Sequence, residues 1–132
     1  MKKSQYLLLI IITCVLALFP SQCFANALTI TNFGPSSVDT TNRTMTFTFD
    51  IAWDNSWRDA TNYDAVWIFM KRKNTSTDVW SHATMAESGT NPSGFSAPTD
   101  SEIIVPTDLK GFFFQRTDTG ADDVSFEGVQ FV

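Results

Sequence analysis

The chain has 132 residues, of which 43% are hydrophobic and 14% aromatic, which favours a single globular domain. It carries 14 acidic and nine basic residues, giving a formal net charge of −5 at pH 7. This charge repels phosphate backbones, so a nucleic-acid partner is not expected.

The first 27 residues have the layout of a secretory signal peptide. Lys2 and Lys3 precede an apolar run from Leu7 to Phe19, and small residues follow at Ala25 and Ala27. The run spans 13 residues, whereas a membrane-spanning helix needs roughly 20. We therefore expect cleavage, after Ala27 or Ala25 with a preference for Ala27, and no stable membrane insertion of the product.

The main alternative for this segment is a lipid anchor on Cys23. Gln22 stands before it, where a lipoprotein signal has a small residue, so the cleaved signal is preferred. Cleavage would remove Cys23 and Cys14, leaving a mature domain, 28–132, without disulfides, thiol chemistry or thiolate-bound metals. It would also change the net charge to −7, which disfavours anionic membrane surfaces. We expect an exported protein, with periplasmic, extracellular and cell-surface locations left open.

The clearest structural signal is the alternation that begins at Thr44. Met45, Phe47, Phe49, Ile51 and Trp53 all share one parity. A period of two places these side chains on one face of a β-strand, and a helix would scatter them around its axis.

A second strand is expected from Tyr63 to Phe69. Apolar residues occupy both parities here, which predicts a central strand covered on both faces, with Lys71 marking its exit to solvent. Gly128 is expected to form a bulge or kink in the last strand. The other expected strands are 28–33, which Gly34-Pro35 would end, then 79–85, 102–105, 110–116 and 124–132.

These segments make about seven strands with turn-rich joins and no convincing helix. The pattern predicts an all-β fold, an antiparallel two-sheet β-sandwich after a cleaved signal peptide. Its aromatic side chains would form a core that replaces disulfides.

The loop from Asp54 to Asp64 holds the candidate binding residues. One hypothesis is a ligand platform, such as a sugar site, in which exposed Trp57 and Arg58 act with Asp54 and Asn55. A plain structural interpretation is favoured over it, in which Trp53 and Trp67 are core and the polar residues shape the turn.

Calcium binding is the other hypothesis for this loop. Asp54, Asn55, Asp59 and Asp64 supply the hard oxygen ligands that calcium prefers. The spacing matches no EF-hand, and no other cofactor is expected. A second acidic segment, 118–123, could also bind calcium, but a solvated hairpin tip is the favoured interpretation.

No catalytic constellation is visible, so we expect no enzyme activity from this chain. His82 is the single histidine, and no serine lies in a Gly-x-Ser-x-Gly elbow. We expect a structural or surface role for His82. A protein or glycan partner is possible on these grounds, and the oligomeric state is open.

Several runs resemble, in the same order, one family of secreted bacterial proteins. They are 49–58, which includes Trp-Asp-Asn-Ser-Trp-Arg, then 62–69, 80–83 and 111–116. They are similar to the N-terminal β-domain of formylglycine-generating-enzyme-like, or sulfatase-modifying-factor-like, proteins. In that family a larger C-terminal domain follows this β-domain.

This sequence stops where the family's second domain would begin, after Val132. No catalytic residue of the family can be carried over, and its cysteine pair has no counterpart in residues 28–132. The resemblance therefore implies an accessory module, or a truncated or split copy of a longer protein, rather than an oxidase.

Overall fold

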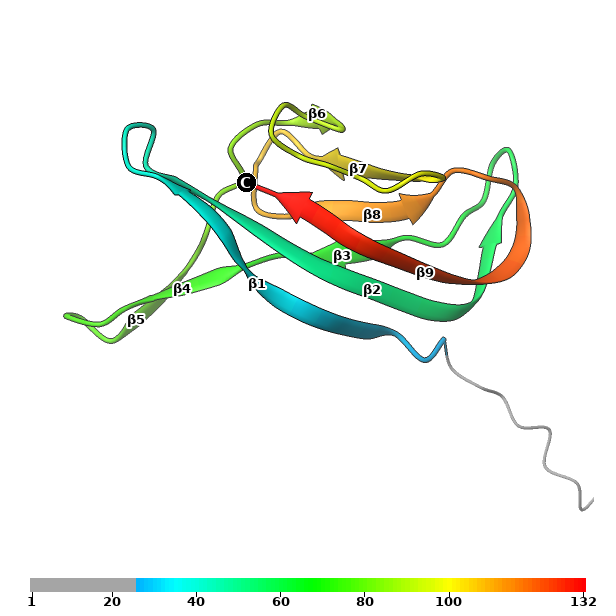
Figure 1. The fold of residues 1–132 in the computed structure, drawn as a ribbon, viewed down its shortest axis with the longest axis horizontal. Coiled ribbons are helices and arrows are strands. Elements are labelled where there is room, and N and C mark those ends of the chain that lie inside the picture. Colours follow the sequence, from blue (N-terminus) through cyan, green and yellow to red (C-terminus); the bar gives the residue numbers. More distant parts are fainter. Residues whose placement is uncertain (1–25) are drawn as a thin grey trace, which may run out of the picture.

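The structure is a computed structural model that describes residues 26–132. The predicted signal peptide, apart from its last two residues, lies outside this part of the chain. Nine strands form three antiparallel sheets (Figure 1). Their bounds are β1 Thr29–Asp39, β2 Thr44–Arg58, β3 Val66–Ile68, β4 Lys71–Asn74, β5 Val79–His82, β6 Gly89–Thr90, β7 Ser101–Val105, β8 Phe112–Arg116 and β9 Gly120–Phe131.

The first sheet has the order β1-β2-β9, and the alternation of β2 explains its burial. Phe49, Ile51 and Trp53 are each at most 3% exposed, because a period of two aims them at one side of the sheet. The expected irregularity at Gly128 is confirmed: its φ is 69°, and the β2–β9 register shifts beside it. The Gly128 amide donates to Asp50 Oδ1 at 2.8 Å, which ties the bulge to β2.

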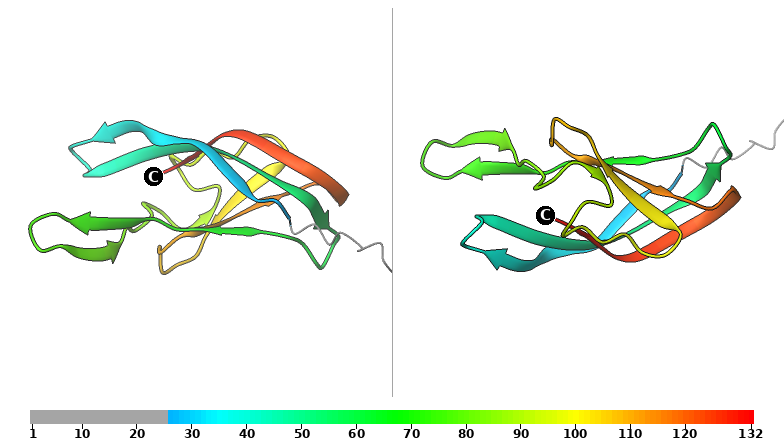
Figure 2. Two further views of the ribbon diagram at one scale, coloured as in Figure 1. Left: turned by 90° about the horizontal axis from the view of Figure 1, so that it is seen from below. Right: turned by 90° about the horizontal axis from the view of Figure 1, so that it is seen from above.

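The second sheet has the order β3-β8-β7-β6, and it shares one core with the first. Phe112 and Phe114 of β8 are fully buried. Phe112 lies 6.5 Å from Phe49, and Phe114 lies 6.3 Å from Trp53, measured between ring centroids. Figure 2 shows the two sheets as separate layers. The all-β, antiparallel class is confirmed, and these interlayer contacts favour the expected two-sheet sandwich.

The prediction that the strand around Trp67 is central and covered on both faces is wrong. β3 pairs only with β8 and lies at an edge of its sheet. Trp67 is 40% exposed and Phe69 49% exposed. The apolar run suggested burial, but burial depends on what covers a strand, and no layer covers the outer face of β3 in the described chain.

Several strand boundaries also differ from the prediction: β2 continues to Arg58, β3 is shorter, and β9 begins at Gly120. β1 continues through Gly34 and Pro35 because register shifts on both sides of them absorb the irregularity. Pro35 is tolerated since β1 is an edge strand, where a missing N–H need not break a ladder. The basic segment at Lys71 leaves the sheet of β3 and is exposed to solvent, as expected, but it also begins a further strand, β4. Together with the short β6, β4 raises the count from about seven to nine.

β4 and β5 form a two-stranded hairpin of their own, which projects from the body of the protein (Figures 1 and 2). All eight of its strand residues are exposed. Between residues 26 and 132, there is no helix with the length and apolarity needed to span a membrane.

Candidate functional site

The predicted binding segment, 54–64, consists of the end of β2 and a tight turn that Asp59 organises. Its Oδ1 accepts hydrogen bonds from the amides of Thr61, at 2.7 Å, and Asn62, at 2.6 Å. These donors, the Asn62 amide first, hold the pKa of Asp59 below its ordinary value. Asp59 therefore acts as a turn former, as the structural interpretation of this loop expected.

Asp64 closes the other side of the loop against Trp57. Its Oδ2 accepts from the Trp57 amide, and its own amide donates to the Trp57 carbonyl, both at 2.9 Å. Asn55, with a φ of 56°, donates its amide to Asp123 Oδ1 at 2.8 Å. Within residues 26–132, no three carboxylate, histidine or cysteine side chains gather into a group that could hold a metal ion. Calcium binding by Asp54, Asp59 and Asp64 stays a prediction.

The expected loop is shorter than predicted: Asp54, Asn55, Trp57 and Arg58 of the predicted sugar platform lie at the end of β2, and Tyr63 lies in the turn that follows. Trp57 is 47% exposed, and Tyr63 is 50% exposed. The Arg58 guanidinium lies 4.8 Å from the centre of the Tyr63 ring. Arg58 also donates to the Arg116 carbonyl at 2.8 Å and lies 3.6 Å from Glu102. Trp57 is thus open to a ligand, while Arg58 is partly engaged by the protein itself.

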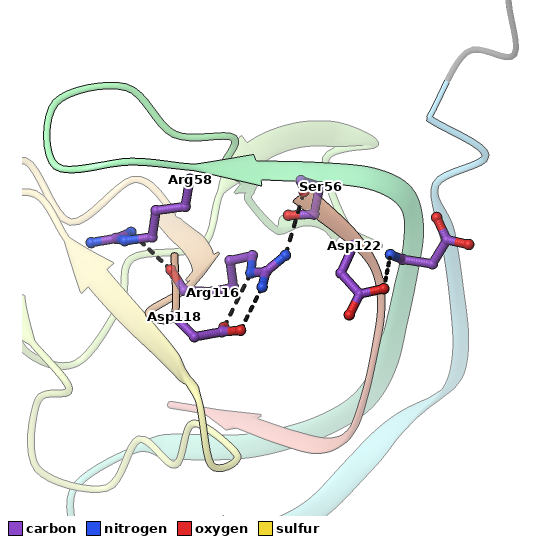
Figure 3. Close-up of polar contacts among 6 residues, drawn as sticks. Ser56, Arg58, Arg116, Asp118 and Asp122 are labelled. Carbon is purple, nitrogen blue, oxygen red and sulfur yellow. Dashed lines mark hydrogen bonds and ion pairs between the residues drawn. The ribbon is translucent and has the colours of Figure 1, made fainter. Parts of the chain in front are cut away.

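A buried arginine, which the sequence analysis did not single out, holds the second acidic segment (Figure 3). Arg116 is 3% exposed and makes a two-pronged ion pair with Asp118, whose Oδ1 lies 3.1 Å from Arg116 Nε. Its Nη1 reaches the Ser56 carbonyl at 3.4 Å. Hydrogen bonding to Arg116 holds the pKa of Asp118 below its ordinary value.

The segment from Asp118 to Asp123 is not a hairpin tip. Its first residues connect β8 of the four-stranded sheet to β9 of the three-stranded sheet, and Gly120 to Asp123 already belong to β9, so the chain crosses between the layers here. The favoured hairpin interpretation was wrong because sequence proximity does not reveal that two successive strands belong to different sheets. The ion pair of Arg116 and Asp118 anchors this crossing.

An open apolar groove lies between the edge strands β1 and β3. We call it the edge groove. Its centre is a hollow of about 240 Å³, lined only by apolar side chains. Ile30 and Phe33 on its β1 side are 49% and 57% exposed, and Phe69 on the other side is 49% exposed. The lining residues are Ile30, Phe33, Phe49, Ile68, Phe69, Met70 and Phe131.

The edge groove continues at one end. Met70 and Phe131 also line a larger hollow of about 670 Å³, which extends towards the β1–β2 turn and the β4–β5 hairpin. A third hollow, of about 370 Å³, includes Leu28, Trp53 and Trp67. The groove could not be predicted from local patterns, because it forms only where two distant edges face one another. The sequence offered only the few apolar residues of β1, such as Ile30, Phe33 and Val38, which the structure leaves exposed.

His82 lies on the exposed β5 strand, with its ring 5.7 Å from that of Phe69. This placement agrees with the expected surface role.

Comparison with known proteins adds no relative: no family model, curated protein or solved structure matches this chain.

Proposed function

We propose that this protein is an exported, non-catalytic interaction module with a β-sandwich fold, whose edge groove receives an extended segment of a partner protein. The proposal rests on one observation: exposed apolar side chains lie beside strand edges that have no paired neighbour in the described chain. β1 hydrogen-bonds only to β2, and β3 only to β8, within the described chain. Unpaired backbone groups of an edge strand are a template for another extended chain.

The chemistry of the groove favours an extended polypeptide as its occupant. An added strand pairs with edge N–H and C=O groups, and its alternate side chains enter the pockets beside the edge. The all-apolar hollow beside Ile30 and Phe33 suits such side chains. Burying apolar area here contributes roughly 25 cal/mol per Å² removed from water.

A model ligand tests the proposal directly. We would measure fluorescence anisotropy of a labelled peptide with the alternating sequence of residues 44–53. The expected result is saturable binding that Ile30→Asp weakens at least tenfold, because a charge would enter an apolar hollow. The matched control is Val38→Asp, on the same strand, exposed and outside the hollow.

Hydrogen exchange locates the bound peptide. Amides of β1 and β3 should become protected when the peptide binds, while those of β7 should not change. Equal binding by the two aspartate variants would contradict the proposal. Concentration-dependent dimerisation abolished by Ile30→Asp would instead assign the groove to a second copy and also overturn it.

The resemblance to formylglycine-generating-enzyme-like proteins extends the proposal: the module would be the N-terminal part of a longer protein of that kind. Reading the genomic sequence downstream of the codon for Val132 tests this extension. A continuing frame that encodes a second domain supports it, and a stop codon followed by an intergenic gap contradicts it. The binding experiment stands independently of this outcome.

A sugar or calcium ligand at the loop from Asp54 to Asp64 is the second candidate. The exposed rings of Trp57 and Tyr63 favour it, since flat aromatic surfaces stack on sugar rings. A glycan array with the wild type and Trp57→Ala tests the sugar, and thermal melting with and without calcium tests the metal. Absence of array hits and of a calcium-dependent shift would remove this candidate.

A further inference from the structure

The basic residues of the described chain gather at one end of the molecule. Residues 26–132 contain seven Lys and Arg, and four of them lie in the β1–β2 turn and in β4. Figure 2 shows this turn and the β4–β5 hairpin at the same end. We call this the basic end. Its four cations are Arg43, Lys71, Arg72 and Lys73.

Only part of this charge is neutralised locally. These elements carry two carboxylates, Asp39 and Asp78. Asp39 caps the β1–β2 turn by accepting from the amides of Thr41 and Asn42. Asp78 Oδ1 lies 2.5 Å from Lys73 Nζ. The β8–β9 connection with Asp118, and the start of β9 with Asp122 and Asp123, lie at the opposite end (Figure 1). The net negative charge of the chain, which as a whole disfavours an anionic membrane surface, is therefore unevenly distributed, and the basic end is locally positive.

Exposed apolar side chains accompany the cations on the hairpin. Trp80 is 61% exposed, and Val79 is 59% exposed. The register places Trp80 opposite Lys73, whose Nζ lies 5.9 Å from the Trp80 ring. Neither Trp80 nor Val79 belongs to the hydrophobic core. A projecting two-stranded hairpin is marginally stable by itself, so a surface that buries Trp80 would also stabilise it.

We propose that the β4–β5 hairpin docks the protein onto an anionic phospholipid surface. Lys71 and Lys73 share the face of Trp80 and approach the lipid phosphates, while Arg72 on the other face adds to the local positive potential. Each cation near such a surface contributes about 1 kcal/mol. Trp80 enters the interfacial region, where the amphipathic indole ring is favoured. Charge complementarity selects this occupant, and the acidic connection at the far end points away from the surface.

Vesicle partitioning tests the docking surface. The processed chain would be sedimented with phosphatidylglycerol vesicles and, separately, with phosphatidylcholine vesicles at low ionic strength. The expected result is binding to the anionic vesicles alone, lost when salt shortens the Debye length. Replacing all three hairpin cations, K71Q/R72Q/K73Q, should lower partitioning on the order of 100-fold.

Matched variants separate docking from a general charge effect. Lys110→Gln removes an exposed cation of the β7–β8 connection, which is not part of the hairpin, and should lower partitioning far less than the triple variant. Trp80→Ala should weaken binding and abolish a vesicle-induced blue shift of tryptophan fluorescence. Because the hairpin contributes no core residue, these variants should melt like the wild type, which confirms that they fold.

Three results would overturn the proposal. The first is equal partitioning onto the two kinds of vesicle. The second is equal loss in the triple variant and Lys110→Gln. The third is tight, hairpin-dependent binding to a soluble polyanion such as heparin without vesicle binding, which would identify an anionic polymer as the partner.

Discussion

Replacing Phe114 with alanine tests whether the two sheets are held together by a single core. Phe114 is fully buried on β8, and its ring lies 5.3 Å from Phe126 and 6.3 Å from Trp53 of the other layer. Phe→Ala at a buried site costs about 3–5 kcal/mol, since it removes apolar burial and leaves a cavity. For a domain of this size the Tm should fall by at least roughly 12 °C.

Phe113 provides the matched control, because it is the neighbouring residue on the same strand and faces the opposite side. It is 41% exposed, and its ring packs at a tilt against that of Trp67, with the centroids 4.7 Å apart. Phe113→Ala should therefore cost only about 1 kcal/mol, the value of a partly exposed aromatic pair.

Urea unfolding followed by circular dichroism measures both variants. If Phe114→Ala does not fold, Phe114→Leu leaves a smaller cavity and keeps the comparison measurable. A double-mutant cycle between Phe114 and Trp53 should show a coupling of about 0.5–1.5 kcal/mol across the layers. Equal destabilisation by the two phenylalanine variants, or no coupling to Trp53, would refute the single interlayer core.

Two further predictions concern the acidic connection and the close packing at β8. Arg116 lowers the pKa of Asp118 in the folded state. The pair therefore stabilises the fold at pH values above the unfolded pKa of this carboxyl. This contribution is lost as the pH falls through the lower folded pKa. Asp118→Asn should thus reduce the free energy of unfolding at pH 7, and its difference from the wild type should shrink below about pH 4; a difference that does not vary with pH would contradict this. Gly111→Ala should cost about 1–3 kcal/mol in urea unfolding, because its Cβ would lie 2.5 Å from the Ile68 carbonyl oxygen. Gly34→Ala, where a Cβ meets nothing within 4 Å, should have little effect, and equal costs for the two alanines would exclude the steric explanation.

Much of the fold could be predicted from local patterns. The alternation along β2 correctly identified Phe49, Ile51 and Trp53 as one buried face. The bulge at Gly128 followed from the conformational freedom of glycine inside a strand. Both inferences succeed because they concern which side of a strand a residue occupies, which is a property of the local backbone.

The candidate site was less accessible to this reasoning. The turn-forming role of Asp59 agrees with the structural interpretation, but Arg116 escaped notice because its partners, Asp118 and Ser56, meet only in the folded chain. The error at Trp67 has a similar cause. Its apolar surroundings in sequence suggested a covered strand, yet its exposure depends on which strands lie beside and above it.

The amino-acid sequence by itself determined the all-β class, the inward face of β2 and the excess of negative charge, because side-chain alternation and composition act locally or as sums over the chain. Only the tertiary structure decided which strands became edges, where the edge groove opened, and how the charges separated between the two ends. These features depend on residues that are far apart in the chain, such as Ile30 and Phe69, which line the same hollow. A local hydrophobic period carries no information about which distant residues meet, so these features are decided only when the two layers pack.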